Sequence, residues 1–194
     1  MPFAVGVSLD PASAAVVGEL IHDVLAVTGA DLTHVSETSP HLTLAVAEEV
    51  EVPAVEQLLA EIAGSMPAPA LTFSHLGVFL GDERVVFLAS VVTAELIAFH
   101  LAFHRRFEAM ARDQSPLYLP GRWVPHCTLA RDLAPDAIPR AVGACGQLVL
   151  PLKARLSRIV LASFPAPDVR RAVALRQSQR PTVDAAIEEE EYHQ

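Results

Sequence analysis

The pattern of apolar and polar positions divides the chain into alternating strand-like and helix-like segments. Short apolar runs rich in β-branched residues predict strands, whereas apolar residues that recur every three or four positions predict helices. Strands are expected at residues 3–9, 41–47, 71–80, 84–92, 126–130, 155–164 and 169–177. Helices are expected at residues 11–28, 53–64 and 93–112, with a short one after residue 130 whose limits Pro139 leaves open.

The first helix carries the clearest local signals. Asp10 is suited to cap its start, Pro11 to occupy its first position and Gly29 to end it. Apolar residues recur at helical spacing between these limits, at Val16, Val17, Leu20, Ile21, Val24 and Leu25.

The order strand-helix-strand-helix-strand occurs twice. Leu71 lies 30 residues after His41, and Leu156 lies 30 residues after His126, which indicates a duplication. We therefore expect an α+β fold with duplicated β-α-β-α-β halves, which form two pseudo-symmetric lobes with antiparallel-type sheets around a central cleft. Residues 1–180 are predicted to form a single bilobal domain, with lobes at roughly 1–80 and 81–180, followed by an acidic flexible tail at 181–194.

A six-residue pattern, P-H-x-T-L-A, occurs once in each half, at residues 40–45 and 125–130. Side chains alternate between the two faces of a strand, so the histidine, threonine and alanine of each copy should share one face. These residues are His41, Thr43 and Ala45 in the first copy and His126, Thr128 and Ala130 in the second. The other face is apolar and should pack into the core.

The repeated residues favour acid-base chemistry on a phosphate group. Histidine changes its charge near neutral pH, so His41 and His126 could act as one neutral base and one protonated acid. The hydroxyls of Thr43 and Thr128 could donate hydrogen bonds to the non-bridging phosphate oxygens. This arrangement requires neither a metal nor a cofactor. Each copy taken singly would suit an ordinary strand histidine, and only the matching pair favours catalysis.

Composition narrows the classes of protein that fit. Hydrophobic residues make up 52% of the chain and charged residues 19%, which is enough apolar material for a core. The net charge is −9, with four of those charges from residues 188–191, so the chain lacks the basic surface of a protein that binds long nucleic acid. A small nucleotide or the end of an RNA remains compatible with this charge. No apolar run is expected to span a membrane and no signal peptide is evident, which favours a cytoplasmic protein.

Three residues just before the second copy are candidate substrate contacts. Tyr118 or Trp123 could stack on a base, and Arg122 could meet a second phosphate, although core packing of Trp123 and solvent exposure of Arg122 fit equally well. His100 and His104 lie four positions apart on a predicted helix, the spacing of a metal pair. No third ligand is evident for them, and an ordinary helix face is the simpler interpretation.

The two H-x-T-L stretches resemble the 2H phosphoesterase superfamily. The setting of the second copy, Gly-Arg-Trp-Val-Pro-His-Cys-Thr-Leu-Ala-Arg at 121–131, is similar to the branch of the bacterial 2′-5′ RNA ligases and RNA 2′,3′-cyclic phosphodiesterases. The resemblance implies a bilobal α+β fold and metal-independent cleavage of cyclic phosphodiesters. It also implies that His41 and His126 act as acid and base and that Thr43 and Thr128 bind phosphate.

The function expected from the sequence is hydrolysis of 2′,3′-cyclic phosphates on nucleotides or RNA ends. The partner would be such a nucleotide or RNA end, with no membrane and no protein partner implied. Two alternatives stay open: a 2′-5′ RNA ligase that runs the reaction in reverse, and a non-catalytic module that binds nucleotides or RNA ends. A metal-dependent hydrolase based on His100 and His104 is a further, weaker alternative.

Overall fold

The computed structural model describes residues 1–30, 39–164 and 168–177 of the 194-residue chain. The predicted acidic tail, 181–194, lies outside these described residues. The strands are β1 (Phe3–Leu9), β2 (His41–Val50), β3 (Pro67–Ala68), β4 (Ala70–Phe79), β5 (Val85–Ser90), β6 (Ala111–Gln114), β7 (His126–Ala130), β8 (Leu152–Ser163), β9 (Asp168–Ala174) and β10 (Arg176–Gln177). The helices are α1 (Pro11–Thr28), α2 (Val52–Ser65), α3 (Ala94–Phe107) and α4 (Ala137–Ala144), with short 3₁₀ segments η1 (Glu108–Met110), η2 (Pro116–Tyr118) and η3 (Cys145–Gln147).

The predicted limits of the first helix are confirmed. The Asp10 carboxylate accepts hydrogen bonds from the backbone N–H groups of Ala12 at 3.1 Å and Ser13 at 3.2 Å. Gly29 ends the helix with a φ of 68°, a left-handed conformation in which a side chain would be strained.

Eight of the strands in the described residues form one antiparallel sheet, which confirms the predicted α+β class. Its order is β6-β2-β1-β8-β4-β5-β7, and β9 pairs with β8 on a second edge. β8 joins the two halves of this sheet: its first residues pair with β4, and the rest of it pairs with β1. β3 and β10 form a separate two-stranded parallel pair.

The two β-α-β-α-β halves, which meet between β4 and β5, exchange strands in the sheet. Both β-α-β-α-β halves are present, as β1-α1-β2-α2-β4 and β5-α3-β7-α4-β8. However, β4 pairs with β5 from the second half, and β8 pairs with β1 from the first. Each half therefore gives its third strand to the sheet of the other.

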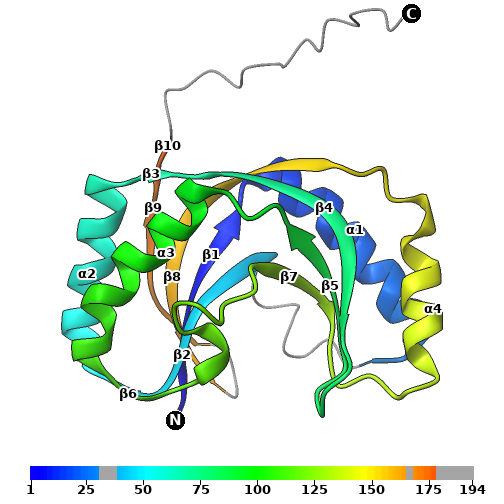
Figure 1. Cartoon of the computed structure of the whole chain (residues 1–194), viewed down its shortest axis with the longest axis horizontal. Helices are drawn as coiled ribbons and strands as arrows, with labels where there is room; N and C mark the ends of the chain where they lie inside the picture. The colour runs from blue at the N-terminus through cyan, green and yellow to red at the C-terminus, as the bar shows by residue number, and fades with distance from the viewer. Residues whose placement is uncertain (31–38, 165–167, 178–194) are drawn as a thin grey trace, which may run out of the picture.

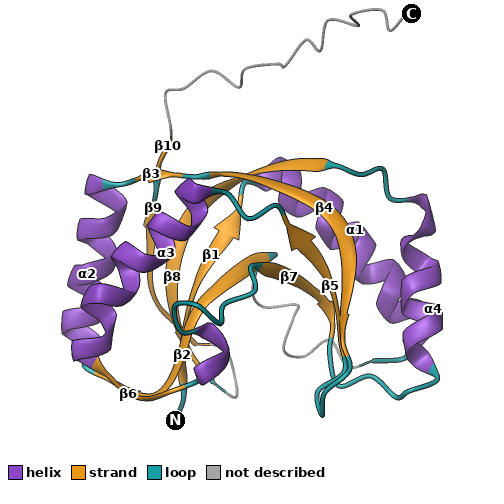
Figure 2. Ribbon diagram, viewed as in Figure 1, coloured by secondary structure: helices purple, strands orange, loops and turns teal. Residues whose placement is uncertain are grey.

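The helices lie in two pairs, one on either side of the sheet in the view of Figure 1. α2 contacts α3, and α1 contacts α4, so each pair also combines the two halves of the chain. In Figure 2 the strands occupy the middle of the molecule between these pairs. The motif strands β2 and β7 contact each other at the centre, where the two halves of the sheet meet.

No stretch able to span a membrane was expected from the sequence, but one helix meets the criteria of length and composition. Within the described part of the chain, α1 alone has the length and apolar composition for it, at 18 residues. Its apolar face is nevertheless buried in the fold, where the helix packs against β7 and α4. One third of this stretch is buried, all on the face that packs into the fold, as in an amphipathic helix of a globular protein.

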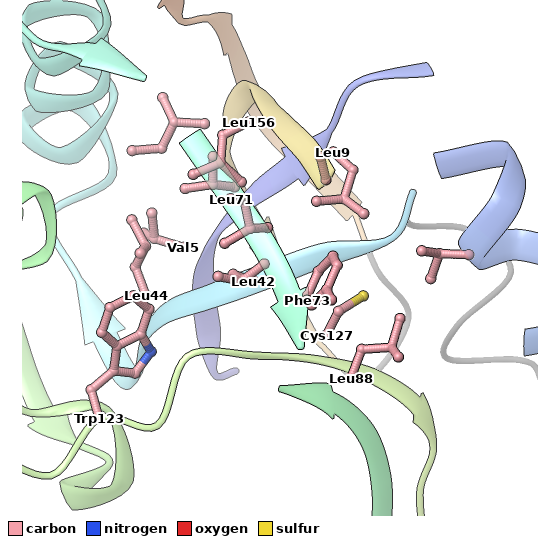
Figure 3. Close-up of a cluster of buried hydrophobic side chains, with 14 of the residues drawn as sticks. Val5, Leu9, Leu42, Leu44, Leu71, Phe73, Leu88, Trp123, Cys127 and Leu156 are labelled. Atoms are coloured by element: carbon pink, nitrogen blue, oxygen red, sulfur yellow. The ribbon is translucent and has the colours of Figure 1, made fainter. Parts of the chain in front are cut away.

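The main hydrophobic core extends through both halves. Figure 3 shows Leu42 and Leu44 of β2 close to Leu71 of β4, with Phe73 and Cys127 beyond them. Because these side chains come from strands of both halves, the motif strands are fixed by one shared core.

The helix predicted for residues 93–112 is shorter than expected. α3 ends at Phe107, and Ala111–Gln114 forms β6, which pairs with the edge of β2 opposite Ala47 and Glu49. Local composition favoured a helix here, but the unpaired edge of β2 provides hydrogen-bond partners that the sequence pattern does not reveal.

Candidate active site

Both copies of the repeated pattern contain the same β-bulge. In β2 the pairing with β1 skips Leu44, and in β7 the pairing with β5 skips Leu129. The extra residue reverses the alternation, so Ala45 and Ala130 turn into the core instead of sharing a face with the histidine and threonine. The sequence prediction for the alanines is therefore wrong, and wrong in the same way in both copies.

The histidine and threonine of each copy lie on the same face of their strand. His41, Thr43, His126 and Thr128 are all half-buried, whereas the residue between them on each strand is fully buried. β2 and β7 contact each other, and the Cys127 side chain approaches the backbone of His41. Burial raises the pKa of the Cys127 thiol to about 12, so the thiol stays protonated in the core.

Both motif histidines are held by the same hydrogen bond. Nδ1 of His41 donates to the carbonyl oxygen of Ser39 at 3.0 Å, and Nδ1 of His126 donates to that of Val124 at 2.7 Å. A carbonyl oxygen can only accept, so Nδ1 carries the proton in both rings. The neutral form of each ring consequently has its lone pair on Nε2, and this atom is available for proton exchange.

The surroundings lower the pKa of both imidazoles. Desolvation is the main cause for each ring, and it outweighs the carbonyl contact, which favours the protonated form. The charge on His126 lowers the pKa of His41 further, so the two rings are close enough to repel each other when both are protonated. Close packing against β1 also positions His41: a Cβ at Gly6 would lie 3.1 Å from its Cδ2.

Tyr118 is the candidate contact that reaches a motif residue directly. It lies close enough to Thr43 for the threonine hydroxyl to act on the pKa of the phenol, which it lowers. Burial raises the pKa of Tyr118, and the negative charge of Glu83 raises it further, while Arg131 opposes both. Arg131 follows the second motif and forms an ion pair with Glu83 at 3.2 Å, so a guanidinium is held near these hydroxyls.

Of the other two candidate contacts, Trp123 is buried and Arg122 is exposed. Trp123 is only 8% exposed, and its Nε1–H donates to the carbonyl oxygen of Thr43 at 2.9 Å. It packs beside Leu44 in Figure 3 and supports β2 from inside, which is the core-packing alternative for this residue. Arg122 is exposed, as its alternative interpretation required.

His100 and His104 form a second support for the motif strand. Their rings lie 4.4 Å apart in the core, and His100 stacks on Trp123 at 4.0 Å. Nε2 of His104 donates to the carbonyl oxygen of Leu44 at 2.9 Å, and Nε2 of His100 donates to that of Tyr118 at 3.0 Å. Burial lowers the pKa of His100 to about 4, which keeps the ring neutral at physiological pH. Within the described residues, no group of three His, Cys, Asp or Glu could hold a metal.

Sequence reasoning missed two aromatic residues next to His126. The rings of Phe79 and Phe87 have centroids 5.1 Å and 5.0 Å from the imidazole. Their position depends on the register of three strands, because Phe87 pairs with Thr128 across β5 and β7, and with Gly77 across β4 and β5. The hydrophobic pattern alone could mark them only as strand residues.

The mixed fold of helices and an antiparallel sheet matches the phosphoesterases of the two-histidine, or 2H, class. A family model described as the 2′-5′ RNA ligase superfamily matches residues 16–167. The chain therefore belongs to this superfamily, whose enzymes are phosphoesterases or ligases. No curated protein matches the sequence.

Solved structures share the fold at low sequence identity. TT0787 of Thermus thermophilus has a TM-score of 0.61 and 23% identity, and the match covers 91% of this chain and 99% of that one. LigT of E. coli in complex with 3′-AMP has a TM-score of 0.59 and 20% identity, over 91% of this chain and 100% of that one. Usb1 of Kluyveromyces marxianus has a TM-score of 0.50 and 10% identity, over 90% and 97%.

Proposed function

We propose that this chain is a metal-independent phosphodiesterase that hydrolyses 2′,3′-cyclic phosphates of nucleotides or RNA ends. The observation that carries the proposal is the matched pair of imidazoles. His41 and His126 lie on two strands that contact each other, each with Nδ1 held by a carbonyl and Nε2 available for proton transfer. Such a pair can provide one base and one acid for a single displacement at phosphorus.

In the proposed reaction, the neutral imidazole takes a proton from a water molecule through Nε2. The water oxygen forms a bond to phosphorus while the bond to the 2′- or 3′-oxygen of the ribose breaks. The protonated imidazole gives its proton to that departing oxygen, and the product is an acyclic phosphate monoester. After the reaction the two rings have exchanged protonation states, and exchange with solvent restores them.

The threonines would orient the phosphate between the two rings. The hydroxyls of Thr43 and Thr128 are half-buried and lie two residues after the histidines on the same strands. Each would donate a hydrogen bond to a non-bridging oxygen, which stabilises the charge that builds up there. Tyr118 would hold the Thr43 hydroxyl in place, and the exposed Arg122 would contact a longer substrate beyond the reacting phosphate.

The solved relatives support a nucleotide as substrate. E. coli LigT, which shares the fold, has been crystallised in complex with 3′-AMP, with ATP and with NADP⁺. Each of these ligands carries a phosphate on a nucleoside. A 2′,3′-cyclic phosphate on a nucleoside combines the same groups with the strained diester that paired imidazoles could open.

The test is to incubate the protein with 2′,3′-cyclic AMP in the presence of EDTA and to identify the product by phosphorus NMR. We expect a single monoester, either 2′-AMP or 3′-AMP. His41→Ala and His126→Ala should each lower kcat/KM on the order of 10³-fold. His22→Ala is the matched control, because His22 is an exposed histidine on α1. Wild-type turnover by either folded motif variant would disprove the assignment.

Ligation is a second candidate because the family itself is described as a superfamily of 2′-5′ RNA ligases. In that direction the base would activate a 5′-hydroxyl of one RNA, and the departing oxygen would be the 3′-oxygen of the cyclic phosphate. Two RNA half-molecules, one ending in a 2′,3′-cyclic phosphate, provide the assay. A product of joined length would support ligation, whereas conversion of the cyclic end to a monoester without joining would support hydrolysis alone.

A further inference from the structure

The strongest unassigned feature of the molecule is a pair of aromatic rings beside His126. Phe87 is 5% exposed and belongs to a small buried cluster with Val85 and Ala89 that is separate from the main core. Phe79 lies over it with ring centroids 4.2 Å apart and remains 36% exposed. The edge of this cluster meets the His126 ring, so an apolar, partly exposed surface adjoins one of the two imidazoles.

The backbone is shaped to accommodate this pair. A Cβ added at Gly77 would lie 2.3 Å from the ring of Phe87, which is closer than atoms can approach. The glycine therefore lets Phe87 lie directly over β4, and Phe79 covers Phe87 from the end of the same strand.

The two halves of the site differ at this position although their motif strands match. The residue paired with Thr128 is Phe87, whereas the residue paired with Thr43 is Gly6. The side of the site next to His126 is thus broad and aromatic, while the side next to His41 is small. A pseudo-symmetric site with one aromatic side would bind an asymmetric substrate in one orientation.

We propose that Phe79 forms the subsite for the nucleobase of the substrate, with Phe87 and Gly77 supporting its ring. This inference rests on the proposed function. With the cyclic phosphate between the motif threonines, the ribose would direct its base toward His126 and onto the exposed part of Phe79. A planar base stacks favourably on an aromatic side chain regardless of its hydrogen-bonding edge, so this subsite would select for the presence of a base more than for its identity.

The experiment compares 2′,3′-cyclic AMP with methyl β-ribofuranoside 2′,3′-cyclic phosphate, which keeps the reacting ring but lacks a base. The wild-type protein should prefer the first in kcat/KM, through a lower KM. Phe79→Leu keeps an apolar side chain without the flat ring, and it should reduce this preference about tenfold. Phe79→Trp restores a flat ring and should restore the preference.

Phe3→Leu is the matched control, because Phe3 is a partly buried phenylalanine at the start of β1 and lies outside the motifs. It should keep the wild-type preference, and circular dichroism should show all variants folded. An unchanged preference in folded Phe79→Leu, or a wild-type protein without preference, would overturn the subsite. If the wild-type protein cleaves neither compound, the proposed function fails instead.

Discussion

The imidazoles of His41 and His126 have the same hydrogen bond but different surroundings. Each donates Nδ1–H to the carbonyl two positions earlier, which leaves Nε2 as the reactive nitrogen. His41 packs over β1 at Gly6, while His126 meets the aromatic rings of Phe79 and Phe87. In both cases the ring is withdrawn from water, so the neutral form is favoured over the protonated form.

These lowered pKa values predict the pH dependence of the reaction. Below both pKa values both rings are protonated and no base is present; above both, the rings are neutral and no acid is present. The profile of kcat/KM, which reports the free enzyme, should therefore be bell-shaped with its maximum on the acidic side of the ordinary histidine value of 6.5. Initial rates with 2′,3′-cyclic AMP from pH 4.5 to about 8.5 provide the measurement.

The profile of kcat offers an internal comparison, because it reports the enzyme with substrate bound. The anionic phosphate favours protonated imidazole, so this second profile should be displaced toward higher pH. A maximum of kcat/KM above neutral pH would contradict the desolvation that the site geometry implies.

At this scale the sequence pattern predicted candidate catalytic residues but gave no sign of the residues that surround them. The duplicated pattern singled out His41 and His126 because chemistry constrains residue type and spacing. Phe79 could not be found in the same way, since its position next to His126 depends on strands that pair across the molecule. The bulge at Leu44 was also invisible, because strict alternation was the only available guide to the faces of the strand.

Among the elements, β2 has one edge whose backbone hydrogen bonds come from several different neighbours. β6 covers this edge beyond Ala47, and nearer to the motif the carbonyl oxygens of Thr43 and Leu44 accept hydrogen bonds from Trp123 and His104. An unpaired buried carbonyl would be costly, so these donors compensate for the missing strand. The α3 helix and the loop before β7 thereby set the position of the first motif.

Trp123→Phe tests this support. The variant keeps a flat ring against His100 but removes the donor to the carbonyl oxygen of Thr43. Loss of that partner should lower the free energy of unfolding by about 1–3 kcal/mol, measured by urea denaturation. Because Thr43 would be less well positioned, KM for 2′,3′-cyclic AMP should also rise several-fold.

Phe99→Leu serves as the comparison, because Phe99 is a fully buried aromatic residue on the same helix as His100. It should lower stability through a packing defect while changing KM much less than Trp123→Phe does. If Trp123→Phe and Phe99→Leu lose the same stability and change KM by the same factor, Trp123 contributes to packing alone.

For the elements themselves, the sequence pattern located the main strands and helices well. Capping residues such as Asp10 and Gly29 act locally, which is why the limits of α1 were predicted. β6 was missed because its hydrogen bonds come from β2, which lies far earlier in the chain. Non-local pairing of this kind leaves little trace in local composition.

Over the whole molecule, the exchange of third strands decides how the halves depend on each other. β4 lies between β5 and β8, both from the second half, and β1 lies between β2 and β8. The duplicated order of elements was correctly predicted from the sequence, but the exchange of strands was not. The pattern of apolar and polar residues in β4 and β8 does not indicate whether each strand pairs within its own half or with the other half. The halves share the repeated pattern and yet contribute strands to each other's part of the sheet.

Fragments divided at the turn between β4 and β5 test this interdependence. Residues 1–80 would contain β1 and β4 without β8, so their apolar faces and strand edges would lack partners. Neither 1–80 nor 81–194 should show a cooperative thermal transition alone by circular dichroism, and an equimolar mixture should show one. The mixture should also regain hydrolysis of 2′,3′-cyclic AMP, because the motif strands meet only when both halves are present. A cooperative transition of 1–80 alone would contradict the exchange and favour two autonomous lobes.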